Sequence, residues 1–194
     1  MRPCGTAVFK TFLGGNLVSP IPFAYLHVMD VTAISSSGHG AGSPAVGDKA
    51  PAFAVLDQDG KPVGLADYSG RKLVLYFYPK DDTPGCTAEA CSLRDKHADL
   101  RKAGFEVLGV SPDPVARHGR FAAKYKLPFR LLADPEKTVA KAYGAWGRKK
   151  FLGREYNGIL RTTFLIDEKG TIAHIITKVR TKDHAAQVIE TGAA

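Results

Sequence analysis

The sequence predicts an α/β fold in which a central mixed β-sheet is flanked by helices. Short apolar runs typical of buried strands alternate along the chain with amphipathic stretches typical of helices. Near the C-terminus, two apolar runs are separated by a few turn-forming residues, which predicts an antiparallel hairpin. The length of 194 residues suits one domain of about 150 residues plus a tail, enough for an independent core.

The first predicted elements are a central strand and the helix that follows it. Residues 73–78 form a continuous apolar run that is too short for a helix and rich in strand formers. Pro79 ends this run. Thr83 and Pro84 are residue types preferred at an N-cap and at the first helical position. A helical pattern follows, and Gly104 closes it.

The remaining elements continue the alternation of strands and helices. Further strands are predicted at 105–110, 129–132, 162–166 and 171–177. Further helices are predicted at 113–124, 134–144 and 183–190. Residues 144–160 are interpreted as a loop. Strand, helix, strand, helix, then hairpin and helix is typical of an α/β sandwich of thioredoxin type.

Cys86 is the most informative single residue, because it falls in the first turn of the helix that starts at Pro84. A helix N-terminus presents unpaired N–H groups and favours the thiolate, which is the nucleophilic form of cysteine. Cys91 follows five residues later. The sequence therefore predicts a reactive thiol with a partner.

The spacing of the two cysteines restricts how they can react. On a straight helix, residues five apart have Cα atoms about 8.5–9 Å apart. A disulfide requires a Cα separation of roughly 4.4–6.8 Å. If both residues lie on the helix, they cannot bond until at least one turn unwinds.

The residues before Cys86 carry a resemblance to a known family. Pro79, Thr83 and Cys86 stand in the spacing Pro-x-x-x-Thr-x-x-Cys, which resembles the active-site signature of peroxiredoxins. The stretch 76–95 is similar to the PrxQ or bacterioferritin-comigratory-protein (BCP) class. The resemblance covers about 46–189 and includes the stretches 45–53, 107–111 and 161–167.

The resemblance implies a thioredoxin-like fold and a thiol peroxidase without metal, haem or flavin. It implies that Cys86 is the peroxidatic cysteine, which attacks a peroxide O–O bond and becomes a sulfenic acid. Cys91 matches the resolving cysteine of this class, which closes an intramolecular disulfide. Thr83 matches the family threonine whose hydroxyl bonds the sulfur and the bound peroxide. Pro79 matches the proline that shields the sulfur from water, and Arg161 matches the arginine near the thiolate.

Elementary chemistry supports several of these roles. A guanidinium beside the sulfur favours the thiolate and can donate to the developing oxyanion, which suits Arg161. Glu89 lies one turn from Cys86 and is expected either to join a hydrogen-bond network under the site or to favour the positive end of the helix. Arg94 lies deeper in the helix and is expected to pair with a surface acid.

The resemblance also implies a class of substrate and of electron donor. The substrates implied are hydrogen peroxide and small organic hydroperoxides. A small dithiol protein would reopen the Cys86–Cys91 disulfide by thiol exchange: thioredoxin is favoured, and a glutaredoxin or glutathione route is open. A monomer and a weak homodimer are both compatible with the sequence.

Residues 1–45 lie outside the resemblance and are expected to form a flexible extension to the domain at 46–194. Their glycine, proline and serine content is typical of a linker. Glycines and prolines interrupt the apolar run that a signal peptide needs. Cys4 belongs to no motif, and Met29 is an alternative start of the chain.

Composition excludes several other classes of function. No apolar run is long enough to span a bilayer. Three cysteines are too few for a disulfide framework, and a reducible pair suits the cytoplasm. The net charge is +8, but the basic run 148–150 has no accompanying nucleic-acid motif. Solvated or capping roles without metal binding are expected for the six histidines, His27, His39, His97, His118, His174 and His184.

Two rival functions remain to be weighed. A thiol–disulfide oxidoreductase on the same fold would carry Cys-x-x-Cys at the helix start, whereas residues 87–90 separate the two cysteines here. A redox-linked holdase chaperone or thioredoxin-like interaction protein would leave the matches at Pro79, Thr83, Cys86 and Arg161 unexplained.

Overall fold

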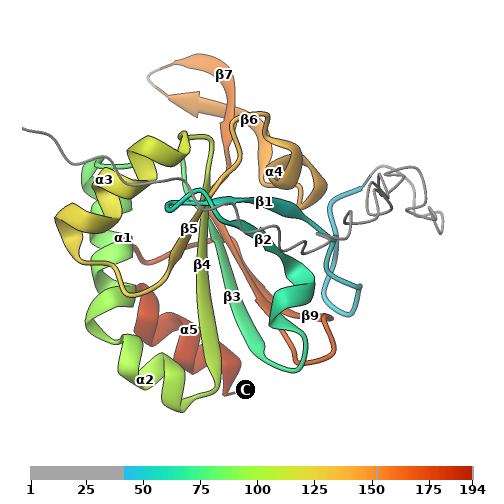
Figure 1. The fold of residues 1–194 in the computed structure, drawn as a ribbon. Helices are drawn as coiled ribbons and strands as arrows, with labels where there is room; N and C mark the ends of the chain where they lie inside the picture. The colour runs from blue at the N-terminus through green and yellow to red at the C-terminus, as the bar shows by residue number, and fades with distance from the viewer. Residues whose placement is uncertain (1–41, 152, 194) are drawn as a thin grey trace, which may run out of the picture. The chain divides into compact units, whose positions relative to one another are not determined.

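A computed structural model describes residues 42–151 and 153–193 of the chain (Figure 1). Apart from residues 42–45, the predicted N-terminal extension lies outside the described residues. The expectations for Cys4, Met29, His27 and His39 therefore lie outside them as well.

The centre of the structure is a mixed sheet, as predicted, and it has seven strands. Its spatial order is β2-β1-β5-β4-β3-β8-β9. The three middle strands run parallel, and the strands on either side of them are antiparallel to their neighbours. The strands are β1 (Ala54–Asp57), β2 (Pro62–Gly64), β3 (Lys72–Phe77), β4 (Phe105–Ser111), β5 (Arg130–Ala133), β8 (Thr162–Ile166) and β9 (Ile172–Ile176).

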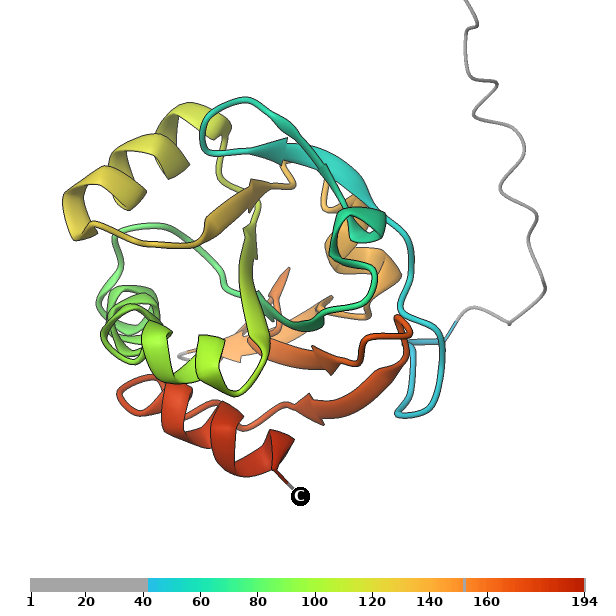
Figure 2. The same ribbon diagram turned by 60° about the horizontal axis from the view of Figure 1, so that its bottom comes forward.

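Helices cover both faces of this sheet (Figure 2). One face packs against α1 (Pro84–Asp95), α2 (His97–Lys102), α3 (Val115–Tyr125) and α5 (His184–Gly192). The other face packs against α4 (Thr138–Ala142) and the short 3₁₀ helix η1 (Leu65–Tyr68).

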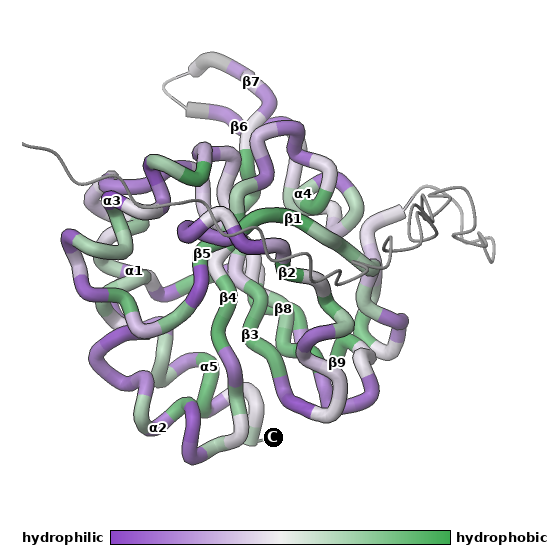
Figure 3. The backbone as a smooth tube through the Cα atoms, in the orientation of Figure 1, coloured by the Kyte–Doolittle hydropathy of each residue, from purple (hydrophilic) through white to green (hydrophobic). Residues whose placement is uncertain are grey.

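Strand β3 contributes to the cores on both faces. Val74 and Tyr76, with Tyr78 just after the strand, point to the side of α1, and Leu75 and Phe77 point to the side of α4. A strand with two buried faces has no polar positions, which explains its continuous apolar run. The hydropathy of the backbone follows this arrangement, with apolar residues in the central strands and polar ones on the outer turns (Figure 3).

The contact between β3 and β4 depends on one glycine. Gly109 lies directly opposite Tyr76 in the parallel pair. A Cβ atom at Gly109 would lie 2.7 Å from the Tyr76 ring and hydroxyl and 2.9 Å from Leu131. The tyrosine ring therefore occupies the space that any larger residue at 109 would need.

Several predicted elements are confirmed to within a few residues, including the hairpin of β8 and β9. The helix predicted from Pro84 to Gly104 is instead two helices: α1 ends at Asp95, and α2 begins at His97. No glycine or proline marks this break. The helix predicted to start at 134 begins only at Thr138, since the Lys137 amide first closes a turn by donating to the Asp134 carbonyl at 2.9 Å and Lys137 adopts a positive φ of 57°. Strands β1 and β2 and helix η1 were not predicted.

Residues 144–160 are not a loop, which corrects the sequence interpretation. They contain the antiparallel hairpin of β6 (Trp146–Phe151) and β7 (Arg154–Ile159). This hairpin projects away from the main sheet and is largely hydrophilic (Figures 1 and 3). Its strands lack the alternation of apolar and polar residues that signals a half-buried strand, so periodicity could not reveal them.

Candidate active site

Cys86 lies in the first turn of α1, where the chain turns from β3 into the helix. Thr83 is the N-cap with extended backbone, and Pro84 is the first helical residue, as predicted. The side chain of Cys86 is buried, with 2% of the residue exposed. The thiol is therefore held at the positive end of a helix and shielded from bulk water.

Arg161 joins the thiol to a buried acid. Its Nη2 atom donates to Cys86 Sγ at 3.2 Å, and its Nη1 atom donates to Glu89 Oε2. Arg161 directly precedes β8, and β8 pairs with β3 so that Thr162 lies opposite Phe77. The antiparallel pairing of these strands brings Arg161 to the end of β3 at which α1 begins.

Glu89 belongs to a hydrogen-bond network under the thiol, the first of the two expectations for it. Its side chain is fully buried and paired with Arg161. Burial raises the pKa of Glu89 to about 7, although the charge of Arg161 acts in the opposite direction. Its second oxygen, Oε1, has no hydrogen-bond partner among the described residues and lies 3.8 Å from His184 Nε2.

Two histidines are buried in polar networks, so the expectation of solvated or capping roles is wrong for them. His184, at the start of α5, places Nε2 at 2.9 Å from Thr163 Oγ1. Burial lowers the pKa of His184 to about 4. His118, in α3, places Nδ1 at 2.8 Å from Asp81 Oδ2. Sequence reasoning missed both, although each precedes apolar core residues at helical spacing.

Thr83 and Pro79 lie in the segment between β3 and α1. The Thr83 hydroxyl donates to the carbonyl of Lys80 at 3.1 Å, and the Thr83 carbonyl accepts the Thr87 amide at 2.8 Å. The described residues show no hydrogen bond from Thr83 to the Cys86 sulfur. The roles of Thr83 and Pro79 stay predictions.

Cys91 is partly buried on the same continuous helix as Cys86, and both thiols are free. The geometric condition for a required unwinding is therefore met. Arg94 pairs with the exposed Asp95 at 2.7 Å, as expected, and also donates to the Tyr125 carbonyl at 2.8 Å.

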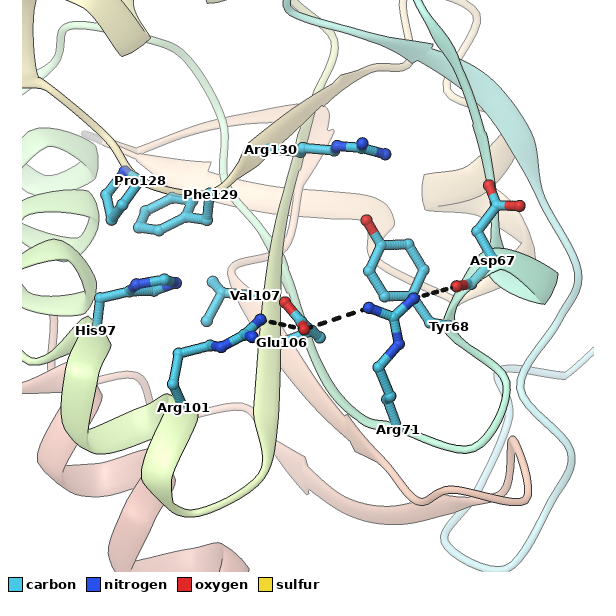
Figure 4. Close-up of a pocket in the computed structure, with 10 residues that line it drawn as sticks. All are labelled: Asp67, Tyr68, Arg71, His97, Arg101, Glu106, Val107, Pro128, Phe129 and Arg130. Atoms are coloured by element: carbon cyan, nitrogen blue, oxygen red, sulfur yellow. Dashed lines mark hydrogen bonds and ion pairs between the residues drawn. The ribbon is translucent and has the colours of Figure 1, made fainter.

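Two cavities differ in whether a predicted site residue lines them. One, of about 610 Å³, is lined by Arg161 and Lys149 together with apolar side chains such as Leu160. Another, of about 510 Å³, contains none of the predicted site residues (Figure 4). In it, Arg71 and Arg101 both bind Glu106, so its charges are largely paired internally.

Within residues 42–151 and 153–193, no group of three acidic, histidine or cysteine side chains is arranged to hold a metal ion. No helix in the same part of the chain is long and apolar enough to cross a membrane.

Comparisons with known proteins agree on one family. The AhpC/TSA family model matches residues 46–175. Peroxiredoxin Bcp of Bacillus subtilis is 47% identical over 146 residues, which is 75% of this chain and 93% of that protein. The structure of Xanthomonas campestris peroxiredoxin Q has a TM-score of 0.69 and 34% identity, covering 73% of this chain and 89% of that chain. The structure of Xanthomonas campestris bacterioferritin comigratory protein, described with alkyl peroxide reduction activity, has a TM-score of 0.69 and 33% identity. The match covers 73% of this chain and 90% of that chain.

Proposed function

Because this chain belongs to the AhpC/TSA family, in its peroxiredoxin Bcp or PrxQ class, it is a peroxidase, and we propose that it reduces hydrogen peroxide and organic hydroperoxides at Cys86. The observation that carries the proposal is the Arg161 guanidinium, which donates to the Cys86 sulfur at 3.2 Å while paired with Glu89. The alkyl peroxide reduction activity of the Xanthomonas campestris relative supports the organic substrates.

In the first step, the Cys86 thiolate attacks the terminal oxygen of the peroxide. An S–O bond forms as the O–O bond breaks, so the sulfur loses two electrons and the peroxide gains them. The leaving oxygen departs as water or alcohol after it takes up a proton. Arg161 stabilises the negative charge that develops on the oxygens, because its Nη2 donor points at the reacting sulfur and its Nη1 donor is fixed by Glu89.

In the second step, Cys91 resolves the sulfenic acid. Its sulfur attacks the Cys86 sulfur, an S–S bond forms, and the S–O bond breaks to release water. Since both residues lie on α1, at least one helical turn unwinds before this bond can form.

In the third step, a dithiol donor restores the two thiols. One donor thiolate attacks the Cys86–Cys91 disulfide, and the second donor thiol displaces the mixed disulfide, so the donor leaves oxidised. Thioredoxin is the favoured donor and glutaredoxin the alternative. The protein would work in the cytoplasm as a monomer or weak homodimer, with 46–194 as its peroxidase domain.

The experiment that tests this function is rapid mixing of reduced protein with one equivalent of hydrogen peroxide, followed by thiol counting and peptide mass mapping. The chain holds three cysteines. Loss of two thiols with a linked Cys86–Cys91 peptide, much faster than oxidation of free cysteine, is the expected result. Slow oxidation without this link would reject the mechanism.

Single substitutions separate the three thiols. Cys86→Ser should abolish rapid oxidation, whereas Cys4→Ser should leave the count of lost thiols unchanged. Cys91→Ser should accumulate a sulfenic acid on Cys86 and lose turnover with thioredoxin. Unchanged turnover in Cys91→Ser would make Cys91 structural. Protection against heat aggregation that survives Cys86→Ser, in a protein without peroxidase activity, would instead favour the holdase.

A further inference from the structure

Asp81 lies in the segment 79–83, which joins β3 to the helix that carries Cys86. The residue is fully buried, and all its hydrogen-bonding groups have partners. Its Oδ1 accepts from the Tyr78 hydroxyl at 2.7 Å, and its Oδ2 lies 2.8 Å from His118 Nδ1. Its amide donates to Asp113 Oδ2 at 2.6 Å, and its carbonyl accepts from Arg117 at 3.1 Å. We call these five residues the Asp81 network.

The contact between Asp81 and His118 requires a shared proton. His118 Nε2 lies 3.2 Å from the Leu132 carbonyl, which can only accept, so Nε2 carries hydrogen. The other ring nitrogen, Nδ1, faces the Asp81 carboxyl oxygen. Either His118 carries a second proton, or Asp81 is protonated and donates to Nδ1. In both cases the two side chains are fully buried, so solvent cannot offer either of them a new hydrogen bond if this one breaks.

The network connects the active-site segment to α3, whose Phe121 and Ala122 are packed in the core. His118 and Arg117 belong to α3, and Asp113 lies just before it. The only covalent route from the network to Cys86 is the short stretch 82–85, of which Asp82 is exposed. Asp82 also binds α3, through Lys124 and the Tyr125 hydroxyl at 2.7 Å each, but in contact with solvent.

We infer that the Asp81 network holds the first turn of α1 folded, and that His118 and Asp81 are positioning residues that set how often this turn unwinds to let Cys91 reach Cys86. Peroxide attack uses the folded turn, in which Arg161 contacts the Cys86 sulfur. Disulfide formation uses the unwound turn. Weakening the network should therefore slow the first step and speed the second. This inference rests on the proposed function.

The test compares three variants of the full chain, two at Asp81 and one at the adjacent Asp82. Asp81→Ala removes both side-chain bonds, so the Tyr78 hydroxyl and His118 Nδ1 keep only the weak 3.4 Å contact between them. Asp81→Asn keeps both bonds, because its amide can donate to neutral His118 and its carbonyl can accept from Tyr78. Asp82→Asn is the matched control, since it weakens an exposed ion pair of the same segment and asparagine tolerates the positive φ of 59°.

The first measurement is amide hydrogen exchange of the reduced proteins, which needs no peroxide. Asp81→Ala should raise exchange in residues 84–91 by at least about tenfold, because it leaves buried groups unpaired. Exchange in β4 should stay unchanged. Asp81→Asn and Asp82→Asn should stay within about threefold of the wild type. Wild-type exchange in Asp81→Ala, or equal exchange in Asp81→Ala and Asp81→Asn, would overturn the inference.

The second measurement separates the two chemical steps by single-turnover kinetics. In Asp81→Ala, oxidation of Cys86 should be slower and disulfide formation faster than in the wild type, a split that general loss of stability does not produce. A fall in both rates would contradict the inference. If the wild type forms no disulfide, the proposed function fails, while the exchange measurement still decides on the network.

A second pair of variants covers the case in which Asp81→Ala does not fold. Tyr78→Phe and Tyr143→Phe each remove one buried hydroxyl, bound to Asp81 at 2.7 Å and to the Pro51 carbonyl at 2.8 Å respectively. Only Tyr78→Phe should raise exchange in residues 84–91. Equal exchange in the two variants would reject the network as the cause.

Discussion

Arg161 contacts two potential anions with one planar group, the Cys86 sulfur and the Glu89 carboxylate. A lysine would keep the charge but could not hold both partners in fixed directions. We expect Arg161→Lys to lower kcat/KM for hydrogen peroxide by about 100-fold, a loss typical of removing one oriented donor. Competition kinetics on Cys86 oxidation measures this.

The matched control for this substitution is Arg94→Lys, because Arg94 binds the exposed Asp95 and the Tyr125 carbonyl rather than the reacting sulfur. Its kcat/KM should stay within about twofold of the wild-type value. Similar losses in both variants would mean that Arg161 acts through stability rather than at the sulfur.

Glu89 makes stability depend on pH. Burial raises its pKa from 4.5 to about 7, so the folded protein keeps this proton over a range in which the unfolded chain has lost it. The stabilisation is fully present below pH 4.5 and is lost as the pH rises through 7. Relative to Glu89→Gln, the free energy of unfolding of the wild type should fall by about 3 kcal/mol over this range. Denaturant unfolding at pH 4.5 and pH 8 measures it, and parallel pH curves would contradict the assignment.

At the residue level, the sequence was most informative where a motif is local. The spacing around Cys86 and the segment after Arg161 identified both residues through a family resemblance. The partner of Glu89 could not be derived from spacing, because Arg161 reaches it through strand pairing between β8 and β3. His118 and His184 were misjudged for the same reason: their partners lie on other elements.

Helix α1 carries both thiols, so its structure should change with the redox state. The proposed Cys86–Cys91 disulfide would be incompatible with a straight helix. We expect amide exchange in residues 86–95 to be faster in the oxidised than in the reduced protein, by at least about tenfold at the most affected amides. Hydrogen exchange with mass spectrometry on both forms measures this. Equal protection would show that the helix does not need to open.

At the level of elements, hydrophobic patterns in the sequence predicted the strands that are deeply buried. The central strands β3, β4 and β8 were predicted because apolar runs bury both of their faces. The hairpin of β6 and β7 was missed because it is hydrophilic. The break at Lys96 was missed because no helix-breaking residue stands there.

At the level of the whole molecule, the proposed site and both cores lie within residues 42–193. We expect a protein that begins at Gly42 to keep the melting temperature of the full chain within about 3 °C, since none of the described core packing is removed. Its rate of Cys86 oxidation should be unchanged. Calorimetry and single-turnover kinetics on both chains measure this, and loss of folding or of rate would assign a role to the preceding residues.

The close approach of Tyr76 to Gly109 has a consequence for the history of the chain. A larger residue at 109 should be disfavoured while Tyr76 and Leu131 keep their size, because its first side-chain carbon would lie 2.7 Å from the ring and 2.9 Å from the leucine. A lineage escapes this constraint only if smaller side chains first replace both neighbours. Across related sequences, a residue larger than glycine at 109 should therefore occur together with smaller residues at 76 and 131.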